Sequence, residues 1–127
     1  MRAIDTNLLV RLVIGDDVDQ TELTEKFIRD GAWVSLLVLA EAIWVLGTRY
    51  DRNAQHLEIV IEMLLQHDEL ILQDADVVQG ALHQFRSNPT LGFSDCLILE
   101  SARKAGHLPL GTFDRKLGKL DGAETVR

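Results

Sequence analysis

Short apolar segments alternate with longer segments of helical character from one end of the chain to the other. Strands are predicted at residues 1–4, 32–35, 70–73 and 108–112, with a weaker one at 124–126. Helices are predicted between them at residues 7–14, 19–30, 38–49, 53–67, 74–86 and 94–105, with a helical turn at 115–117. Because strands that alternate with helices pair in parallel, the chain is predicted to be an α/β protein with a central parallel sheet.

The predicted helix ends rest on residue types that favour caps. Gly15, Gly31 and Gly106 follow the first, second and last helices, Asn53 and Ser94 can begin helices, and Asp74 or Asp76 can begin the one at 74–86. Asp19 with Glu22 three residues later resembles a capping box. The first strand is expected to be buried. The near-continuous apolar content of 38–49 predicts a helix buried on most of its circumference.

Length and composition limit the class of protein. A chain of 127 residues is predicted to form one domain, residues 1–127. No apolar run is long enough to span a bilayer, no signal peptide is expected and Cys96 is the only cysteine, so we expect a cytoplasmic protein with no membrane partner. Cys96 is interpreted as a small buried residue. The net charge of −7 argues against binding nucleic acid through a general basic surface.

Four acidic residues recur beside or inside apolar stretches: Asp5, Glu41, Asp95 and Asp114. A carboxylate removed from water is costly unless it is paired or bound to a cation. Asp5 and Asp114 follow predicted strands, Asp95 lies in the first turn of a helix, and Glu41 lies in the early turns of another. Ligands of parallel sheets bind beyond the carboxyl ends of the strands. We therefore expect the four acids to form one oxygen-rich site for Mg²⁺ or Mn²⁺, which can activate water and neutralise charge on a phosphate.

Each acid also has a simpler explanation. Asp5 and Asp114 can cap the helical segments that follow them, and Asp95 is favoured at a helix N-terminus by the dipole alone. Glu41 can face solvent from one edge of its helix. The four histidines lack metal-ligand spacing. A Ser–His–Asp triad is not excluded by composition, although no Gly-x-Ser-x-Gly elbow is present. The joint pattern of the acids favours the metal site over these separate explanations.

At these residues the chain resembles the PIN-domain ribonucleases, and most closely the VapC toxins of VapBC toxin–antitoxin pairs. The matching segments are Ile4-Asp5-Thr6-Asn7, Ser35-Leu36-Leu37-Val38-Leu39-Ala40-Glu41 with Trp44-Val45-Leu46, Phe93-Ser94-Asp95-Cys96 and Gly111-Thr112-Phe113-Asp114. The order and spacing of the acids fit, and the resemblance covers almost the whole chain.

The resemblance implies a three-layer α/β/α fold and a Mg²⁺- or Mn²⁺-dependent endoribonuclease that cleaves RNA as the toxin of a type II pair. It assigns Asp5, Glu41 and Asp95 to the three main acidic positions and Asp114 to a more variable fourth. It assigns supporting polar positions to Thr6, Asn7, Ser94 and Thr112. It also implies a homodimer and inhibition by a cognate antitoxin. Candidate contacts to the RNA backbone are Arg11, Arg49, Arg86, Arg115 and Lys116.

Two other functions stay open at this point. A receiver-like phosphoryl-transfer domain also gathers acids after strands, but it needs a Lys after its fifth strand and no Lys follows Lys119. A non-catalytic PIN-like binding module would not need four costly carboxylates. Metal-dependent cleavage of RNA separates the enzyme from the binding module.

Overall fold

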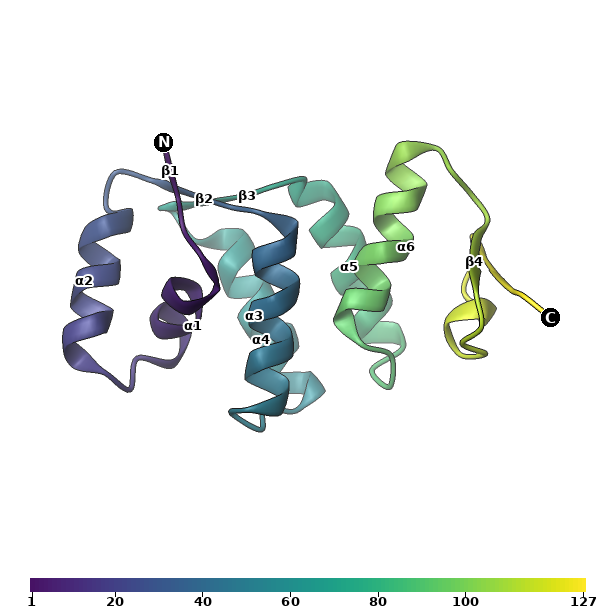
Figure 1. The fold of residues 1–127 in the computed structure, drawn as a ribbon, viewed down its shortest axis with the longest axis horizontal. Helices are drawn as coiled ribbons and strands as arrows, with labels where there is room; N and C mark the ends of the chain where they lie inside the picture. The colour runs from purple at the N-terminus through teal and green to yellow at the C-terminus, as the bar shows by residue number, and fades with distance from the viewer. The chain divides into compact units, whose positions relative to one another are not determined.

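The computed structural model describes all residues 1–127 and divides them into two compact units, Met1–Ala75 (unit 1) and Asp76–Arg127 (unit 2). Figure 1 follows the chain from purple at the N-terminus to yellow at the C-terminus. The expected single domain over residues 1–127 stays a prediction, since each unit is described by itself. No helix combines the length and the apolar character that crossing a membrane requires.

Unit 1 holds a parallel sheet and four helices. Its strands are β1 (Arg2–Ala3), β2 (Ala32–Val34) and β3 (Leu70–Leu72), which pair in the order β1-β2-β3. Its helices are α1 (Thr6–Ile14), α2 (Val18–Ile28), α3 (Leu36–Thr48) and α4 (Ala54–Gln66). Helix α1 packs against α2 and α3, and α4 packs against β3. The predicted α/β fold with a parallel sheet is confirmed.

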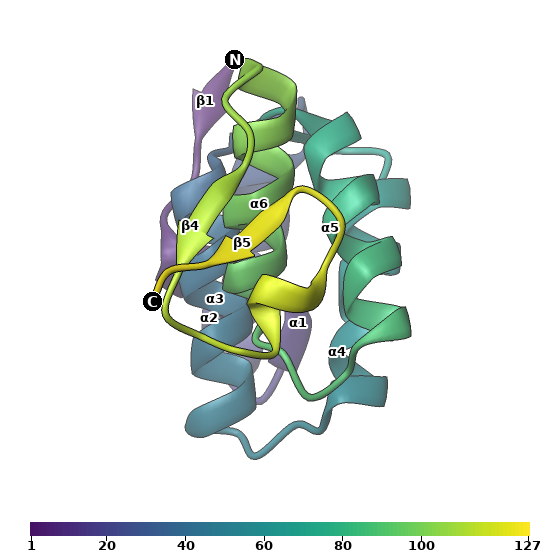
Figure 2. The same cartoon turned by 90° about the vertical axis from the view of Figure 1, so that its right-hand side faces the viewer.

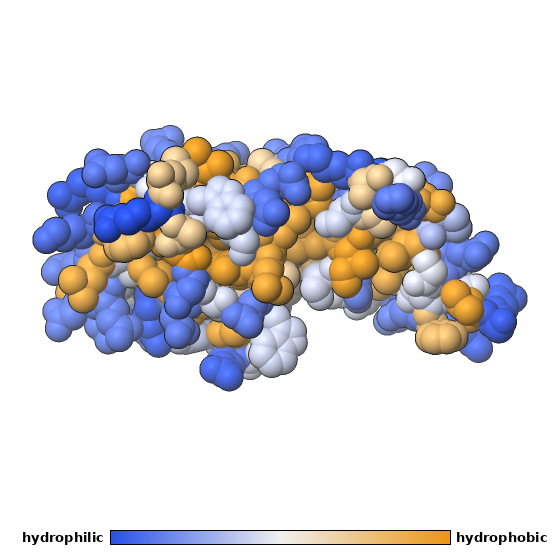
Figure 3. Space-filling view, turned by 45° about the horizontal axis from the view of Figure 1, so that its top comes forward, coloured by the Kyte–Doolittle hydropathy of each residue, from blue (hydrophilic) through white to orange (hydrophobic).

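One face of the unit 1 sheet is part of the core, as the alternation of side chains along a strand requires. Ala32, Val34, Leu70 and Leu72 are buried, whereas the exposed fractions of Trp33 and Ile71 on the alternate face are 37% and 53%. The helices add the fully buried side chains Leu9, Leu39, Leu46, Ile61 and Leu64 to this core. Apolar side chains also reach the surface of the protein, as the space-filling view shows (Figure 3).

Unit 2 holds the remaining helices and its own strand pair. Helix α5 (Ala75–Ser87) begins at the boundary and α6 (Phe93–Ala105) follows; Phe85 and Phe93 meet edge to face with their ring centroids 5.8 Å apart. Strands β4 (Leu110–Thr112) and β5 (Ala123–Thr125) pair in parallel, joined by a 3-10 helix, η1 (Leu117–Lys119) (Figure 2). All five predicted strands are present, and the weak fifth strand is confirmed one residue earlier than expected.

Two of the predicted helix caps are wrong, and α3 begins at Leu36, two residues earlier than expected. Helix α2 is capped by Asp17, whose backbone is extended and whose Oδ1 accepts a hydrogen bond from Gln20 N at 3.0 Å, so Asp19 lies inside the helix and makes no capping box. The helix also ends at Ile28, two residues early. Helix α6 begins after Gly92, so Ser94 lies in its first turn and does not cap it. In both cases a neighbouring residue already has the extended backbone that a cap needs.

Two predictions of burial are also wrong. Strand β1 is exposed at both of its residues because it lies at the edge of its sheet, and only Ile4 just after it is buried. Helix α3 buries one side only: Leu37 and Trp44 are 79% and 60% exposed. These two residues are seven apart, so they lie two turns apart on one outward face.

Candidate metal centre

Asp5 lies between the end of β1 and the start of α1. It is the N-cap of α1, and its Oδ1 accepts a hydrogen bond from Leu8 N at 3.0 Å. Its Oδ2 accepts no hydrogen bond within the chain, and the residue is exposed. The capping explanation of Asp5 is therefore correct, but the cap uses one carboxylate oxygen and fixes the side chain so that the other stays available to a ligand.

Glu41 lies in the second turn of α3, next to the start of α1. Its Oε1 accepts a hydrogen bond from Thr6 Oγ1, and α1 and α3 are packed together. Thr6, expected as a supporting residue, follows Asp5 in the chain and is hydrogen-bonded to Glu41. Unit 1 therefore brings together three of the predicted site residues, Asp5, Thr6 and Glu41.

The start of α3 is held by two residues that were not predicted to belong to the site. Ser35 caps α3, its Oγ accepting from Val38 N at 3.1 Å. Gln73 follows β3, and its Oε1 accepts from Leu36 N at 2.8 Å while its own N–H bonds to Val34 O at 2.8 Å. Both residues follow strands, as Asp5 does, and this position was the available signal. They fix the helix that carries Glu41.

Asp114 follows β4 in unit 2 and is also a cap. Its Oδ1 accepts from Lys116 N at 2.8 Å and from Leu117 N at 3.0 Å, at the start of η1. Its own N–H donates to Thr112 Oγ1 at 3.0 Å, so Thr112 helps to hold the backbone at Asp114; its supporting role at a metal stays a prediction. As for Asp5, Oδ2 has no partner within the chain and the residue is exposed.

Asp95 is the only one of the four acids that is partly buried. It lies in the first turn of α6, where the side chains of Ser94 and Asp95 fold back toward Gly92. Burial raises the pKa of the Asp95 carboxyl, and the neighbouring Asp114 carboxylate raises that pKa further, against a weaker opposing effect of a backbone hydrogen bond at Gly92. Unit 2 therefore brings Asp95 and Asp114 close enough for their charges to interact, and Thr112 is hydrogen-bonded to the backbone of Asp114.

The four acids are not removed from water as their apolar sequence neighbours predicted. Asp5, Glu41 and Asp114 are exposed, because their apolar sequence neighbours point to other sides of the same helix or turn. Within neither unit do three or more His, Cys, Asp or Glu side chains gather into a group that could hold a metal. Each unit instead contributes two carboxylates, and their joint action stays a prediction.

The donor set is nevertheless chemically suited to a hard divalent cation. All four groups offer carboxylate oxygen, which Mg²⁺ and Mn²⁺ prefer. The caps at Asp5 and Asp114 hold Oδ1 and leave Oδ2 available. An oxygen that is fixed in place and lacks a protein partner is suited to bind a cation.

The remaining candidates have less direct roles. Asn7 is exposed and lines a groove between α1 and α2 beside Asp5. Arg11 is paired with Asp16 at 2.8 Å, while Arg115 and Lys116 are exposed next to Asp114. Cys96 is fully buried, and burial raises the pKa of its thiol to about 11, so the interpretation of Cys96 as a core residue and not a nucleophile is supported.

A family model identifies the class of protein to which this chain belongs. The model of the PIN domain matches residues 3–123. The chain belongs to the PIN-domain family, whose members are generally nucleases that use divalent metals. A comparison with curated proteins finds no match. The receiver-like alternative is left without support.

Proposed function

We propose that the chain is a Mg²⁺- or Mn²⁺-dependent endoribonuclease in which all four acids act on one scissile phosphate. The observation that supports this most is the paired arrangement of carboxylates: Glu41 bonded to Thr6 beside Asp5, and Asp95 in the field of Asp114, in a chain that matches the PIN domain over residues 3–123. A binding module would gain nothing from keeping like charges together, so the enzyme is the better explanation.

In this proposal Asp5 and Asp95 bind the cation directly, through oxygens that their own units hold in place. The Thr6 hydroxyl fixes one oxygen of Glu41, so that the other can bind the cation or orient the attacking water. Asp114, fixed by its cap on η1, completes the negative charge of the site. A bound divalent cation supplies an acidic water and positive charge against the phosphate.

The test is cleavage of a labelled single-stranded RNA by the purified chain. We expect cleavage with Mg²⁺ or Mn²⁺, none in EDTA, and recovery when Mn²⁺ is added back in excess. Cleavage that continues unchanged in EDTA would reject the metal-dependent mechanism. No cleavage under any metal condition would favour the binding module.

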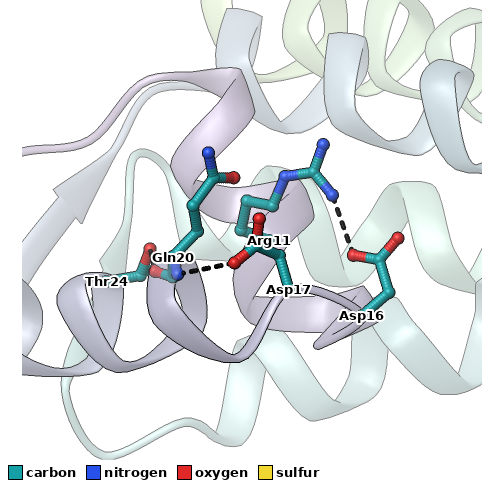
Figure 4. A network of polar contacts seen from close by, with 5 residues as sticks. All are labelled: Arg11, Asp16, Asp17, Gln20 and Thr24. Carbon is teal, nitrogen blue, oxygen red and sulfur yellow. Dashed lines mark hydrogen bonds and ion pairs between the residues drawn. The ribbon is translucent and has the colours of Figure 1, made fainter.

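We further propose that a cognate antitoxin controls the enzyme through a groove between α1 and α2. This groove, of about 410 Å³, is lined by Leu8, Leu23 and Phe27, with Asp5 at its edge. Arg11 bound to Asp16 and the Asp17 cap of α2 fix the turn between the two helices, so the groove is already formed in the free chain (Figure 4). An antitoxin segment could place apolar side chains there and an Arg or Lys against Asp5, in competition with the cation.

Co-expression with the protein encoded immediately upstream tests this control. We expect a complex that cleaves RNA much more slowly than the free chain. Leu23→Glu should release the partner and leave cleavage intact, because Leu23 is exposed, lines the groove and is assigned no part in catalysis. A complex that cleaves as fast as the free chain would reject this proposal.

We also propose that the chain forms a homodimer through the outward face of α4. Ile59 and Met63 lie four residues apart on that face and are 61% and 44% exposed, so a partner would remove both from water. Sedimentation of wild type and of Ile59→Glu tests it: the wild type should have twice the monomer mass and the variant should be a monomer. A monomeric wild type at all concentrations would contradict it.

A further inference from the structure

Unit 2 contains an open groove along β5 and η1, and of its lining residues only Arg115 is among the candidate contacts to the RNA backbone. Its volume is about 1230 Å³, and the side chains that give it chemical character are Phe113, Arg115, Lys119, Glu124, Val126 and Arg127. We call it the β5 groove. Because all of these residues belong to unit 2, its description does not depend on the other unit.

We propose that the β5 groove holds single-stranded RNA next to the cleavage site, with Phe113 stacked on a base and Arg115, Lys119 and Arg127 against phosphates. This inference rests on the proposed ribonuclease function and adds to it the residues that grip the substrate. Phe113 precedes Asp114 in the chain, so a base stacked on its ring would place the neighbouring phosphate near the acids of unit 2.

The side chain of Phe113 is exposed to solvent on a backbone that is hydrogen-bonded on both sides. Its side chain is 83% exposed and makes no ring contact within the protein. The backbone before it is held by the pairing of Thr112 with Thr125 and by the bond from Val126 N to Thr112 O at 2.8 Å. The backbone after it is held by the Asp114 cap. An exposed aromatic ring on a backbone that is held on both sides can stack on an unpaired base, and any base offers the flat surface that stacking needs.

The charges around the ring of Phe113 favour binding of a nucleic-acid backbone. The groove lining contains three cations, Arg115, Lys119 and Arg127, and one carboxylate, Glu124. None of the three cations makes an ion pair within the chain. This local excess of positive charge lies in a protein of net charge −7, which repels nucleic acid elsewhere on its surface. The strand would therefore be held at this groove and not over the whole protein.

An acidic peptide could satisfy the cations but not the aromatic ring, and duplex RNA could satisfy the cations but hides its bases. The combination of cations with an exposed ring therefore favours single-stranded RNA. It also explains how an acidic protein could hold an anionic substrate beside its own carboxylates.

Binding in EDTA tests the groove separately from cleavage. The probe is a fluorescein-labelled 12-nucleotide oligouridine at low salt, followed by anisotropy with the full chain. We expect Lys119→Glu to weaken binding at least about tenfold and Lys26→Glu to weaken it less than about twofold. The two variants have the same net charge, and Lys26 is an exposed residue of α2 that does not line the groove. Equal weakening by both, or no binding by the wild type, would overturn the proposal.

A second series isolates the ring. Phe113→Leu keeps an apolar side chain and loses the aromatic surface, whereas Phe113→Tyr keeps that surface. We expect Leu to weaken binding on the order of tenfold and Tyr to bind like the wild type. Circular dichroism melts should match the wild type for both, because the side chain packs against nothing. Equal binding by the Leu variant, or displacement of the RNA by polyglutamate or by duplex RNA as readily as by oligouridine, would overturn the proposal.

The outcomes separate this inference from the proposed function. RNA that binds in the β5 groove but is never cut would support the groove and reject the nuclease. RNA that is cut with unchanged KM by Lys119→Glu and Phe113→Leu would support the nuclease and reject the groove.

Discussion

The two pairs of acids are held in different ways. In unit 1, Asp5 caps α1 and Glu41 accepts a hydrogen bond from Thr6, so each carboxylate has a polar partner of opposite partial charge. In unit 2, Asp114 is likewise a cap, but Asp95 is partly buried and lies in the field of Asp114, and both conditions raise its pKa. The unit 1 pair is positioned by hydrogen bonds, whereas the unit 2 pair carries an electrostatic cost.

This difference separates two things that a metal site needs. Hydrogen bonds to Thr6 and to helix N–H groups fix oxygens in place, which lowers the ordering cost when a cation binds. Crowded like charges repel one another and destabilise the protein, and a bound cation removes this repulsion. We therefore expect substitutions in unit 1 to disturb the placement of the carboxylate oxygens. Substitutions of Asp95 or Asp114 in unit 2 should remove a ligand and also relieve the repulsion between the two carboxylates.

The largest expected effect is on catalysis and should be the same for the two units. Asp5→Asn and Asp95→Asn should each lower RNA cleavage at least about a hundredfold, because each removes a ligand of a cation worth several kcal/mol to the reaction. Asp19→Asn is the matched control, since Asp19 is an exposed acid of α2 outside the site. Initial rates under saturating Mn²⁺ measure the effect. Near-normal cleavage by either site variant would remove that residue from the mechanism.

The next effect is on stability and compares a tightly packed glycine of unit 2 with an open one of unit 1. A Cβ on Gly118 would lie 1.9 Å from Thr125 Oγ1 and 3.1 Å from Thr125 N, so Gly118→Ala must separate η1 from β5. We expect a loss of about 1–3 kcal/mol in the free energy of unfolding. The control is Gly15→Ala, which has open space around it and a φ of 65°, and which should cost about 1 kcal/mol from backbone strain alone. Urea melts in which Gly15→Ala is the more damaging variant would contradict the close packing of η1 on β5.

A smaller effect tests positioning in unit 1. Thr6→Val removes the donor to Glu41 and keeps the shape of the side chain. We expect about a tenfold loss of kcat and a loss of about 1 kcal/mol in stability, the usual value of one hydrogen bond. Thr6→Ser keeps the hydroxyl and should restore most of the activity. If Val and Ser cleave RNA equally well, the hydroxyl does not position Glu41.

The smallest effect is a titration confined to unit 2. The pKa of Asp95 is raised by burial first and by Asp114 second, so Asp114→Asn should lower the Asp95 pKa but leave it above its usual value. Carboxyl carbon NMR shifts measure this directly. An Asp95 pKa that is unchanged in Asp114→Asn would show that the two charges do not interact.

The same raised pKa has a stability consequence with a definite sign. The folded state binds the Asp95 proton more tightly than the unfolded state, so stability falls as pH rises from the unfolded pKa through the folded one. Asp95→Asn should remove this fall, and the variant should gain relative to wild type above that range. Melts in which the difference between the two proteins does not change with pH would contradict it.

The sequence predicted the order of elements and many of their ends, because these depend on short-range chemistry. Asn53, Gly15 and Gly106 stop or start helices where expected, since caps and left-handed residues act on their nearest neighbours. The capping of α1 by Asp5 and of η1 by Asp114 was foreseen for the same reason.

Burial could not be predicted as well, because it depends on which side of an element meets the rest of the fold. Glu41 stands in an apolar run, yet it is exposed with Trp44, since a helix turns neighbouring residues to different sides. The roles of Ser35 and Gln73 depend on contacts between distant segments that no local pattern specifies. The cap at Asp17 was missed because Asp16 and Asp19, within two residues of it, are equally plausible caps by residue type.

The most direct test of the central claim is Mn²⁺ binding followed by electron paramagnetic resonance at neutral pH. The account predicts that the wild type binds Mn²⁺, and that Asp5→Asn in unit 1 and Asp95→Asn in unit 2 each weaken that binding at least about tenfold, while Asp19→Asn binds like the wild type. Undiminished Mn²⁺ binding in either site variant would contradict the claim that Asp5 and Asp95 bind the same cation.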